Sequence, residues 1–77
     1  MIVNYELTDL FGGEANYSWV KRGEFDVPEN ATQVYIMRKV KQQLDITGIR
    51  CRVSKLGDTL EFRPYGSLCI GFIYFTF

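Results

Sequence analysis

The 77-residue sequence contains no histidine, and this absence removes several kinds of catalytic site. Histidine is the base of Ser-His-Asp and Cys-His arrangements and a frequent zinc ligand, so none of those sites can form. The chain also lacks the G-x-x-x-x-G-K-[ST] and G-x-G-x-x-G loops that hold nucleotide phosphates. We therefore expect no cofactor, no metal ion and no catalytic residues.

Cysteines and long apolar stretches are also scarce. The two cysteines are Cys51 and Cys69, and without a secretory context we expect both to be free thiols. No apolar run reaches the ~20 residues that a membrane-spanning helix needs. The first residues lack the basic and apolar regions of a signal peptide. These features predict a cytoplasmic protein that does not enter the membrane.

The net charge is zero, but the charges are unevenly distributed along the chain. Residues 1–30 contain six acidic and two basic residues, whereas residues 31–77 contain three acidic and seven basic ones. Such a chain can present one acidic and one basic face. The alternative is that the imbalance is the ordinary scatter of charge in a small protein.

The hydrophobic fraction of 47% and the length of 77 residues predict one globular domain over residues 1–77. Alternating apolar and polar residues predict strands, and Pro and Gly mark the turns between them. The expected strands are 2–7, 15–27, 49–54, 59–63 and 68–77. We expect a turn over Thr8–Glu14 and a bulge or kink at Gly23.

A helix is expected over Ala31–Asp45, after Pro28 and with Asn30 as its N-cap. Its apolar positions recur at helical spacing: Val34, Met37, Val40 or Lys41, and Leu44. Gly48 is expected to end it. The order is therefore ββαβββ, which is typical of an α+β two-layer sandwich with one helix on a mainly antiparallel sheet.

One helix covers only one face of a sheet, yet the last strand has apolar residues on both of its faces. We expect the second face to be covered by the Thr8–Tyr17 segment, by a partner, or by another copy through the C-terminal strand. The sequence alone does not distinguish a lid of this kind from an interaction surface.

The segment around Gly12-Gly13 is the first candidate binding site. Adjacent glycines permit positive φ angles, and the side chains of Glu14, Asn16, Tyr17 and Trp19 add polar groups and flat apolar surface. Glu14 alone has no persuasive partner for acid–base chemistry, so we do not expect an enzyme. The alternative interpretation of the segment is a solvated turn.

Arginine and tyrosine form the second candidate. Arg50 and Arg52 share one face of a strand, and Arg63 and Tyr65 follow on the next strand and its turn. Such residues hold phosphates and stack on bases, which favours a nucleic-acid module or a small-nucleotide site. The alternatives are the ordinary polar face of a sheet and a turn fixed by its Pro and Gly. The pI near 6.2 also disfavours non-specific nucleic-acid binding.

The stretch Phe11-Gly12-Gly13-Glu14-Ala15-Asn16-Tyr17-Ser18-Trp19-Val20, with Arg50-Cys51-Arg52 and Arg63-Pro64-Tyr65-Gly66-Ser67, resembles small uncharacterised proteins of bacteriophages and mobile elements. The resemblance implies an anti-defence role, either as an anti-CRISPR-type inhibitor bound to a host protein or as a sponge for a signalling nucleotide. A small nucleic-acid-binding module and an oligomerising accessory phage protein are the alternatives.

Overall fold

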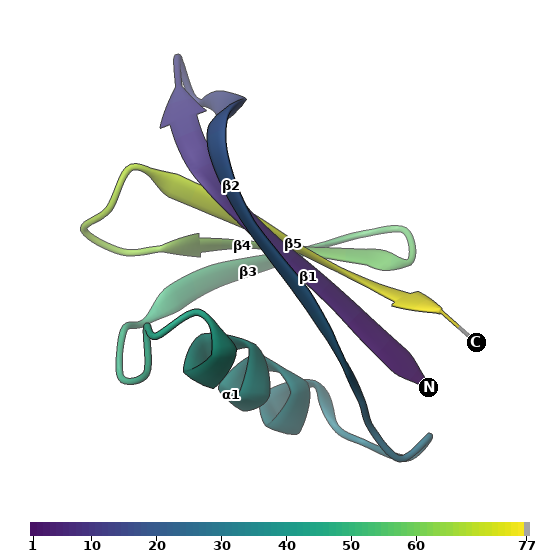
Figure 1. Cartoon of the computed structure of the whole chain (residues 1–77). Helices are drawn as coiled ribbons and strands as arrows, with labels where there is room; N and C mark the ends of the chain where they lie inside the picture. The colour runs from purple at the N-terminus through teal and green to yellow at the C-terminus, as the bar shows by residue number, and fades with distance from the viewer. Residues whose placement is uncertain (77) are drawn as a thin grey trace.

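The computed structural model describes residues 1–76 and shows five strands and one helix (Figure 1). The elements are β1 (Ile2–Phe11), β2 (Glu14–Asp26), α1 (Gln33–Gln43), β3 (Cys51–Leu56), β4 (Thr59–Pro64) and β5 (Cys69–Thr76). The predicted α+β class and the order ββαβββ are confirmed. Phe77, the expected last residue of the final strand, lies outside the described residues.

All the strands belong to one antiparallel sheet with the order β2-β1-β5-β4-β3. The last strand along the sequence is therefore the central strand of the sheet. It joins the β1–β2 hairpin on one side to the β3–β4 hairpin on the other. The two edge strands are β2 and β3.

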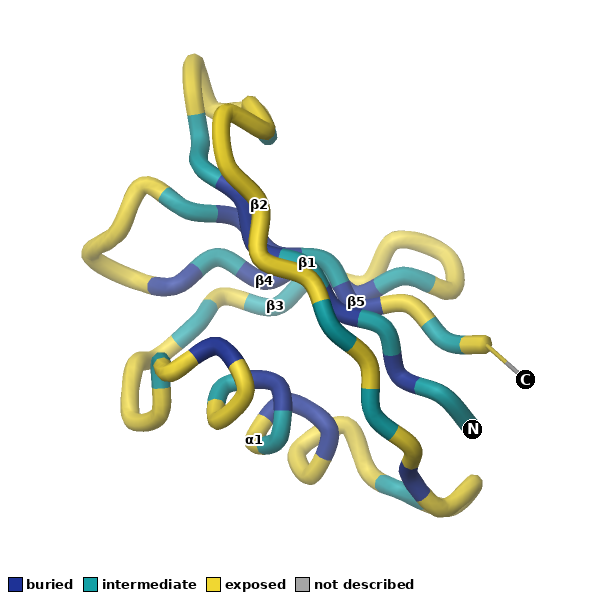
Figure 2. Tube along the Cα trace, in the orientation of Figure 1, coloured by how far each residue is buried: buried dark blue, intermediate teal, exposed yellow. Residues whose placement is uncertain are grey.

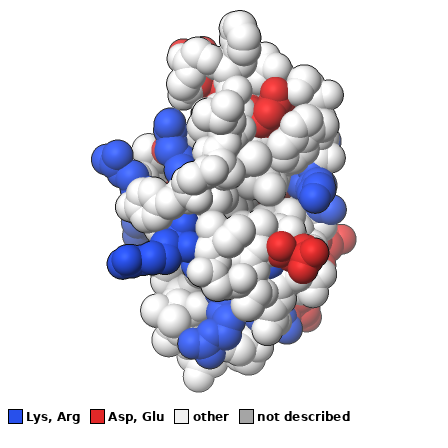
Figure 3. All heavy atoms as spheres, turned by 90° about the vertical axis from the view of Figure 1, so that its left-hand side faces the viewer, with Lys and Arg blue, Asp and Glu red and all other residues white. Residues whose placement is uncertain are grey.

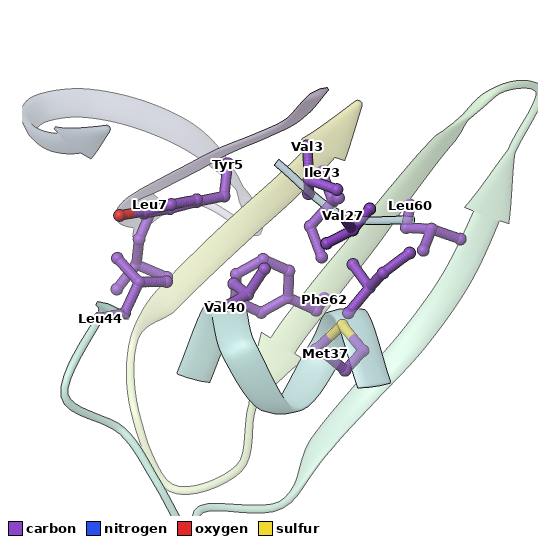
Figure 4. Packing of buried hydrophobic residues seen from close by; sticks show 11 residues of the cluster. Val3, Tyr5, Leu7, Val27, Met37, Val40, Leu44, Leu60, Phe62 and Ile73 are labelled. Atoms are coloured by element: carbon purple, nitrogen blue, oxygen red, sulfur yellow. The ribbon is translucent and has the colours of Figure 1, made fainter. Parts of the chain in front are cut away.

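The core lies between the helix and one face of the sheet (Figure 4). Val40 of α1 is fully buried there, together with Phe62 of β4 and Ile73 of β5. Figure 2 shows the same asymmetry, since buried residues line the side of α1 that faces the strands. Burial of such side chains contributes about 1.5–3 kcal/mol each to stability.

At two positions in the sheet, a glycine leaves room for the aromatic ring of the residue paired with it. Gly71 pairs with Phe62, and Gly23 pairs with Tyr5. A Cβ added at either glycine would overlap the ring of its partner. The predicted bulge at Gly23 is therefore wrong, because Gly23 is in regular register and its missing side chain makes room for Tyr5.

The first hairpin turn is shorter than expected. Only Gly12 and Gly13 form it, with φ angles of 63° and 83°, and β1 continues to Phe11. Two positive φ angles are what a tight two-residue hairpin turn requires. The true irregularity lies opposite Thr8 and Leu10, where β2 contains extra residues between Ala15 and Val20. We call Asn16–Trp19 the bulge segment.

The helix begins and ends at other residues than the pattern predicted. Thr32, not Asn30, is the N-cap, and its hydroxyl accepts a hydrogen bond of 3.1 Å from the Tyr35 amide. At the other end, Asp45 adopts a φ of 59° and the Ile46 amide donates to the Lys41 carbonyl at 2.9 Å. This is the Schellman arrangement, so the helix stops before Gly48.

The predicted buried stripe of the helix is confirmed at Met37, Val40 and Leu44 and wrong at its first position. Val34 is 67% exposed, whereas Ile36 is buried and lies one turn before Val40. The second hairpin shows a similar shift. Because Gly57-Asp58 alone form its turn, β3 runs from Cys51 to Leu56 rather than from Ile49 to Ser54.

Candidate functional site

The face of the sheet away from α1 is the candidate site, and we call it the open face. Strand alternation and the pairing register identify its residues. From edge to edge they are Val20, Arg22 and Glu24; Asn4, Glu6 and Thr8; Ile70, Phe72 and Tyr74; Glu61 and Arg63; and Arg52 and Ser54.

Aromatic residues occupy the middle of the open face. Tyr74 is 45% exposed, and its neighbour on the same face of β5, Phe72, is half-buried. Tyr17 lies at one end of the same face, where its amide donates to the Thr8 hydroxyl at 2.9 Å, and its side chain is 46% exposed. Partial burial and then the Glu6 carboxylate raise the pKa of Tyr17. We call Tyr17, Phe72 and Tyr74 the aromatic patch.

Ion pairs flank the aromatic patch on both sides. In the row of residues through Phe72, Glu6 precedes it on β1 and Glu61 follows it on β4. Glu6 pairs with Arg22 at 3.3 Å, and Glu61 pairs with Arg63 at 3.0 Å. The patch is therefore an apolar strip between two charged margins.

Four of the predicted binding residues meet at the β3–β4 end of the open face. Arg52 lies directly opposite Arg63, and the Tyr65 amide bonds to the Arg50 carbonyl at 2.9 Å. We call Arg50, Arg52, Arg63 and Tyr65 the arginine cluster. Like charges directly opposite each other in a sheet are destabilising. Glu61 offsets part of this cost at Arg63.

The other four predicted residues lie in or beside the bulge segment, and their environment is largely structural. The Asp9 carboxylate accepts hydrogen bonds from the Asn16 amide group at 2.9 Å and from the Ser18 hydroxyl at 2.6 Å. The bonds from Ser18 and then Asn16 hold the pKa of Asp9 well below its ordinary value. Asn16 is thus occupied in fixing the bulge.

Thr8 also fixes the bulge segment, through its side-chain hydroxyl. Its hydroxyl donates to the Trp19 carbonyl at 2.8 Å and accepts from the Tyr17 amide at 2.9 Å. Thr8 is fully buried, and Ile70 opposite it is 3% exposed. The Thr8–Tyr17 segment, expected as a lid over the second face, instead forms the paired ends of β1 and β2 with the turn between them. Tyr74 remains 45% exposed.

The predicted residues do not form one small site. Trp19 lies in β2 and Arg52 in β3, the two edges of the sheet. Four interstrand spacings separate these edges, a distance of about 19 Å. The end of the glycine hairpin does lie next to the turn that carries Tyr65, since the Leu10 amide donates to the Leu68 carbonyl at 2.9 Å. A shallow site between the two stays a prediction. Glu14 is exposed and lies in β2 next to the turn. Strands β1 and β5 therefore lie between it and β4, which carries Arg63.

Sequence reasoning missed Glu6 and did not include Phe72 and Tyr74 among the site residues. The signal for the two aromatics was present, because alternation along 68–77 places them together on one face. For Glu6 there was no signal, since its pairing with Arg22 depends on the hairpin register.

Other kinds of site find little support in the described residues 1–76. No group of three or more Cys, Asp or Glu side chains is placed to hold a metal ion there. Cys51 and Cys69 are free thiols on strands separated by β4. The single described helix is too short to cross a lipid bilayer.

Comparison of the chain with protein-family models, with curated proteins and with solved structures finds no match.

Proposed function

We propose that this chain acts by binding a protein partner through the aromatic patch of its open face, without catalysis. The observation that carries the proposal is an accessible aromatic strip, with Tyr74 45% exposed, on a sheet face that no helix covers. Tyrosine, phenylalanine and arginine are enriched in protein interfaces, and an apolar centre with a charged rim is their usual arrangement.

The sequence resemblance gives this binding a biological context. We propose that the chain is a phage or mobile-element protein that works in the host cytoplasm as an anti-defence factor. The flanking ion pairs suit a protein partner, since Arg22 and Arg63 each have a carboxylate beside them. A rim of paired charges confers specificity without strong attraction to phosphate.

A matched pair of tyrosines tests the proposal. Tyr74 on the open face is 45% exposed and Tyr35 on the helix is 41% exposed. Truncating either one therefore removes a similar amount of accessible surface. We expect the wild-type chain to raise phage plating in bacteria that carry an active CRISPR–Cas system. Tyr74→Ala loses most of this effect, because a central tyrosine contributes at least about 2 kcal/mol to binding. Tyr35→Ala retains it.

A photo-crosslinking amino acid at positions 74 and 35 supplies the physical readout. Position 74 is expected to capture one host protein that position 35 does not. Equal plating with and without the chain contradicts the anti-defence role, and equal crosslinking from the two positions contradicts the binding face.

A nucleic-acid partner is the second candidate, and the arginine cluster favours it. Arg52 directly opposite Arg63, with Tyr65 beyond them, offers charge to phosphates and a ring to a base. If this function holds, Arg52→Gln weakens binding of single-stranded DNA with a steep salt dependence. The matched variant Arg38→Gln on the helix leaves it unchanged.

A small signalling nucleotide is the remaining ligand that the resemblance implies. A ligand present at 100 times its Kd adds about 2.7 kcal/mol to stability, so a melting scan against mono- and cyclic nucleotides detects it. Self-association through Gly71–Ile73 of β5 would use the open face, because β1 and β4 occupy both edges there.

A further inference from the structure

A groove separates α1 from the edge strand β3, on the opposite side of the sheet from the open face. Its volume is about 540 Å³, and its apolar lining comes from Val34 and Met37 of the helix and Val53 of the strand. Arg38 and Lys41 stand among its polar lining residues, and none of its lining residues is acidic. We call this space the edge groove.

The main chain of β3 beside the groove has unused hydrogen-bonding groups. The Tyr65 amide bonds to Arg50, so Arg50, Arg52 and Ser54 are the positions that bond toward β4. By alternation, Cys51, Val53 and Lys55 direct their amides and carbonyls outward, where the sheet ends. Cys51 and Val53 also line the groove, and Lys55 lies on the same face of β3.

A segment added to this edge would meet different chemistry on its two faces. Alternate side chains would point into the edge groove against Val34, Met37 and Val53. The side chains between them would lie on the open-face side, directly across from Arg52. Arg52 already faces Arg63 on its other side and is itself exposed. An acidic residue there would relieve the like-charge contact.

We propose that the edge groove binds an extended acidic segment of a partner protein, which adds to β3 as a sixth strand. Its apolar residues enter the groove at every second position, and the carboxylates between them pair with Arg52 on the open-face side. The stretch Cys51–Lys55 fits about five residues of such a segment at 3.3 Å each.

A second copy of this chain is a poorer occupant. Pairing β3 with another β3 would bring Arg52 and Lys55 of both copies together on one narrow edge. Lysine and arginine on an edge strand oppose such pairing. The charges on this edge favour an acidic strand and disfavour the β3 strand of another copy.

The test uses two acetylated, amidated peptides of about seven residues, one alternating Val and Glu and the other alternating Val and Lys. Hydrogen exchange by NMR follows the individual amides, with peptide present up to about 1 mM, the weak end of specific binding. The Val–Glu peptide is expected to slow exchange at Cys51, Val53 and Lys55. The amides of Arg22 and Glu24 on the other edge strand are the internal control.

Charge reversal at one position makes the test specific. Arg52→Glu gains an attraction to Arg63, so it is expected to fold. The variant should bind the Val–Glu peptide about tenfold more weakly than the wild type does, and it should bind the Val–Lys peptide instead. Tyr74→Ala should bind the Val–Glu peptide like the wild type, which separates this proposal from the one for the open face.

Three results overturn the proposal. The first is unchanged exchange at Val53 at the highest peptide concentration. The second is equal affinity of the wild type for the two peptides. The third is slow exchange at Cys51, Val53 and Lys55 without peptide in a chain that light scattering shows to be dimeric, since a second copy then occupies the edge.

Discussion

Asp9 is the residue that shapes the most distinctive stretch of the sequence. Its carboxylate bonds to Asn16 and Ser18, and the neighbouring Thr8 hydroxyl holds Tyr17 and Trp19. The segment suggested a binding loop because its polar residues are close together in the chain. Their use in a bulge could not be predicted, because it depends on the register of β1 against β2.

This environment predicts an acid-sensitive contribution to stability. The folded pKa of Asp9 lies below its ordinary value near 3.8, so the folded state favours the ionised form. The stabilisation is present above about pH 4, and it is lost as the pH falls through the folded pKa. Urea unfolding should therefore show wild type more stable than Asp9→Asn near neutral pH, with the difference shrinking below about pH 4.

Glu24→Gln is the control, since it removes a carboxylate from β2 without touching the network. A constant difference between wild type and Asp9→Asn from neutral pH down to about pH 3 contradicts the role of the charge. A purely packing role for Asp9 would give that result.

At the scale of the elements, the sequence predicts which segments are strands or helix more reliably than where they begin. The five strands and the turn at Gly12-Gly13 were expected, because alternation and Gly-containing turns are local signals. The observed boundaries differ from the predicted ones where two nearby residues could fill the same structural role. Asn30 and Thr32 are both good N-caps, and it is the Thr32 hydroxyl that accepts the bond from the Tyr35 amide.

The two cap candidates give a direct comparison. Thr32→Ala should lower stability by about 1 kcal/mol, because the Tyr35 amide loses its acceptor. For a domain of this size that corresponds to a fall in melting temperature of about 4–8 °C. Asn30→Ala should change stability by no more than about 0.5 kcal/mol. Thermal unfolding followed by circular dichroism measures both, and equal effects would contradict the assignment of the cap.

At the scale of the whole molecule, the position of β5 was the main feature that the sequence could not supply. Ile73 of β5 pairs with Tyr5 of β1 and with Leu60 of β4, contacts between distant parts of the chain. No local pattern encodes such pairings, so the open face could be anticipated but its composition could not. The edge groove also follows from β3 being an edge strand.

The antiparallel pairing of β1 with β5 places the start of β1 beside the end of β5. Ile2 pairs with Thr76, and Figure 1 shows these two strand ends next to each other. A circular permutant that joins them with a short Gly-Ser linker and opens between Gly57 and Asp58 should fold, with a loss of about 1–2 kcal/mol. Urea unfolding measures the loss.

Opening the chain between Phe72 and Ile73 is the control for the permutant, because it cuts the central strand. That version should show no cooperative unfolding. If both permutants unfold alike, the central role of β5 in the sheet is wrong.

The central place of β5 has a consequence for synthesis on the ribosome. The β1–β2 and β3–β4 hairpins both need β5 as a neighbour, yet it is the last of the strands to be translated. An isolated two-stranded hairpin is at best marginally stable in water. We therefore expect the nascent chain to lack a stable five-stranded sheet until Cys69–Thr76 has left the exit tunnel.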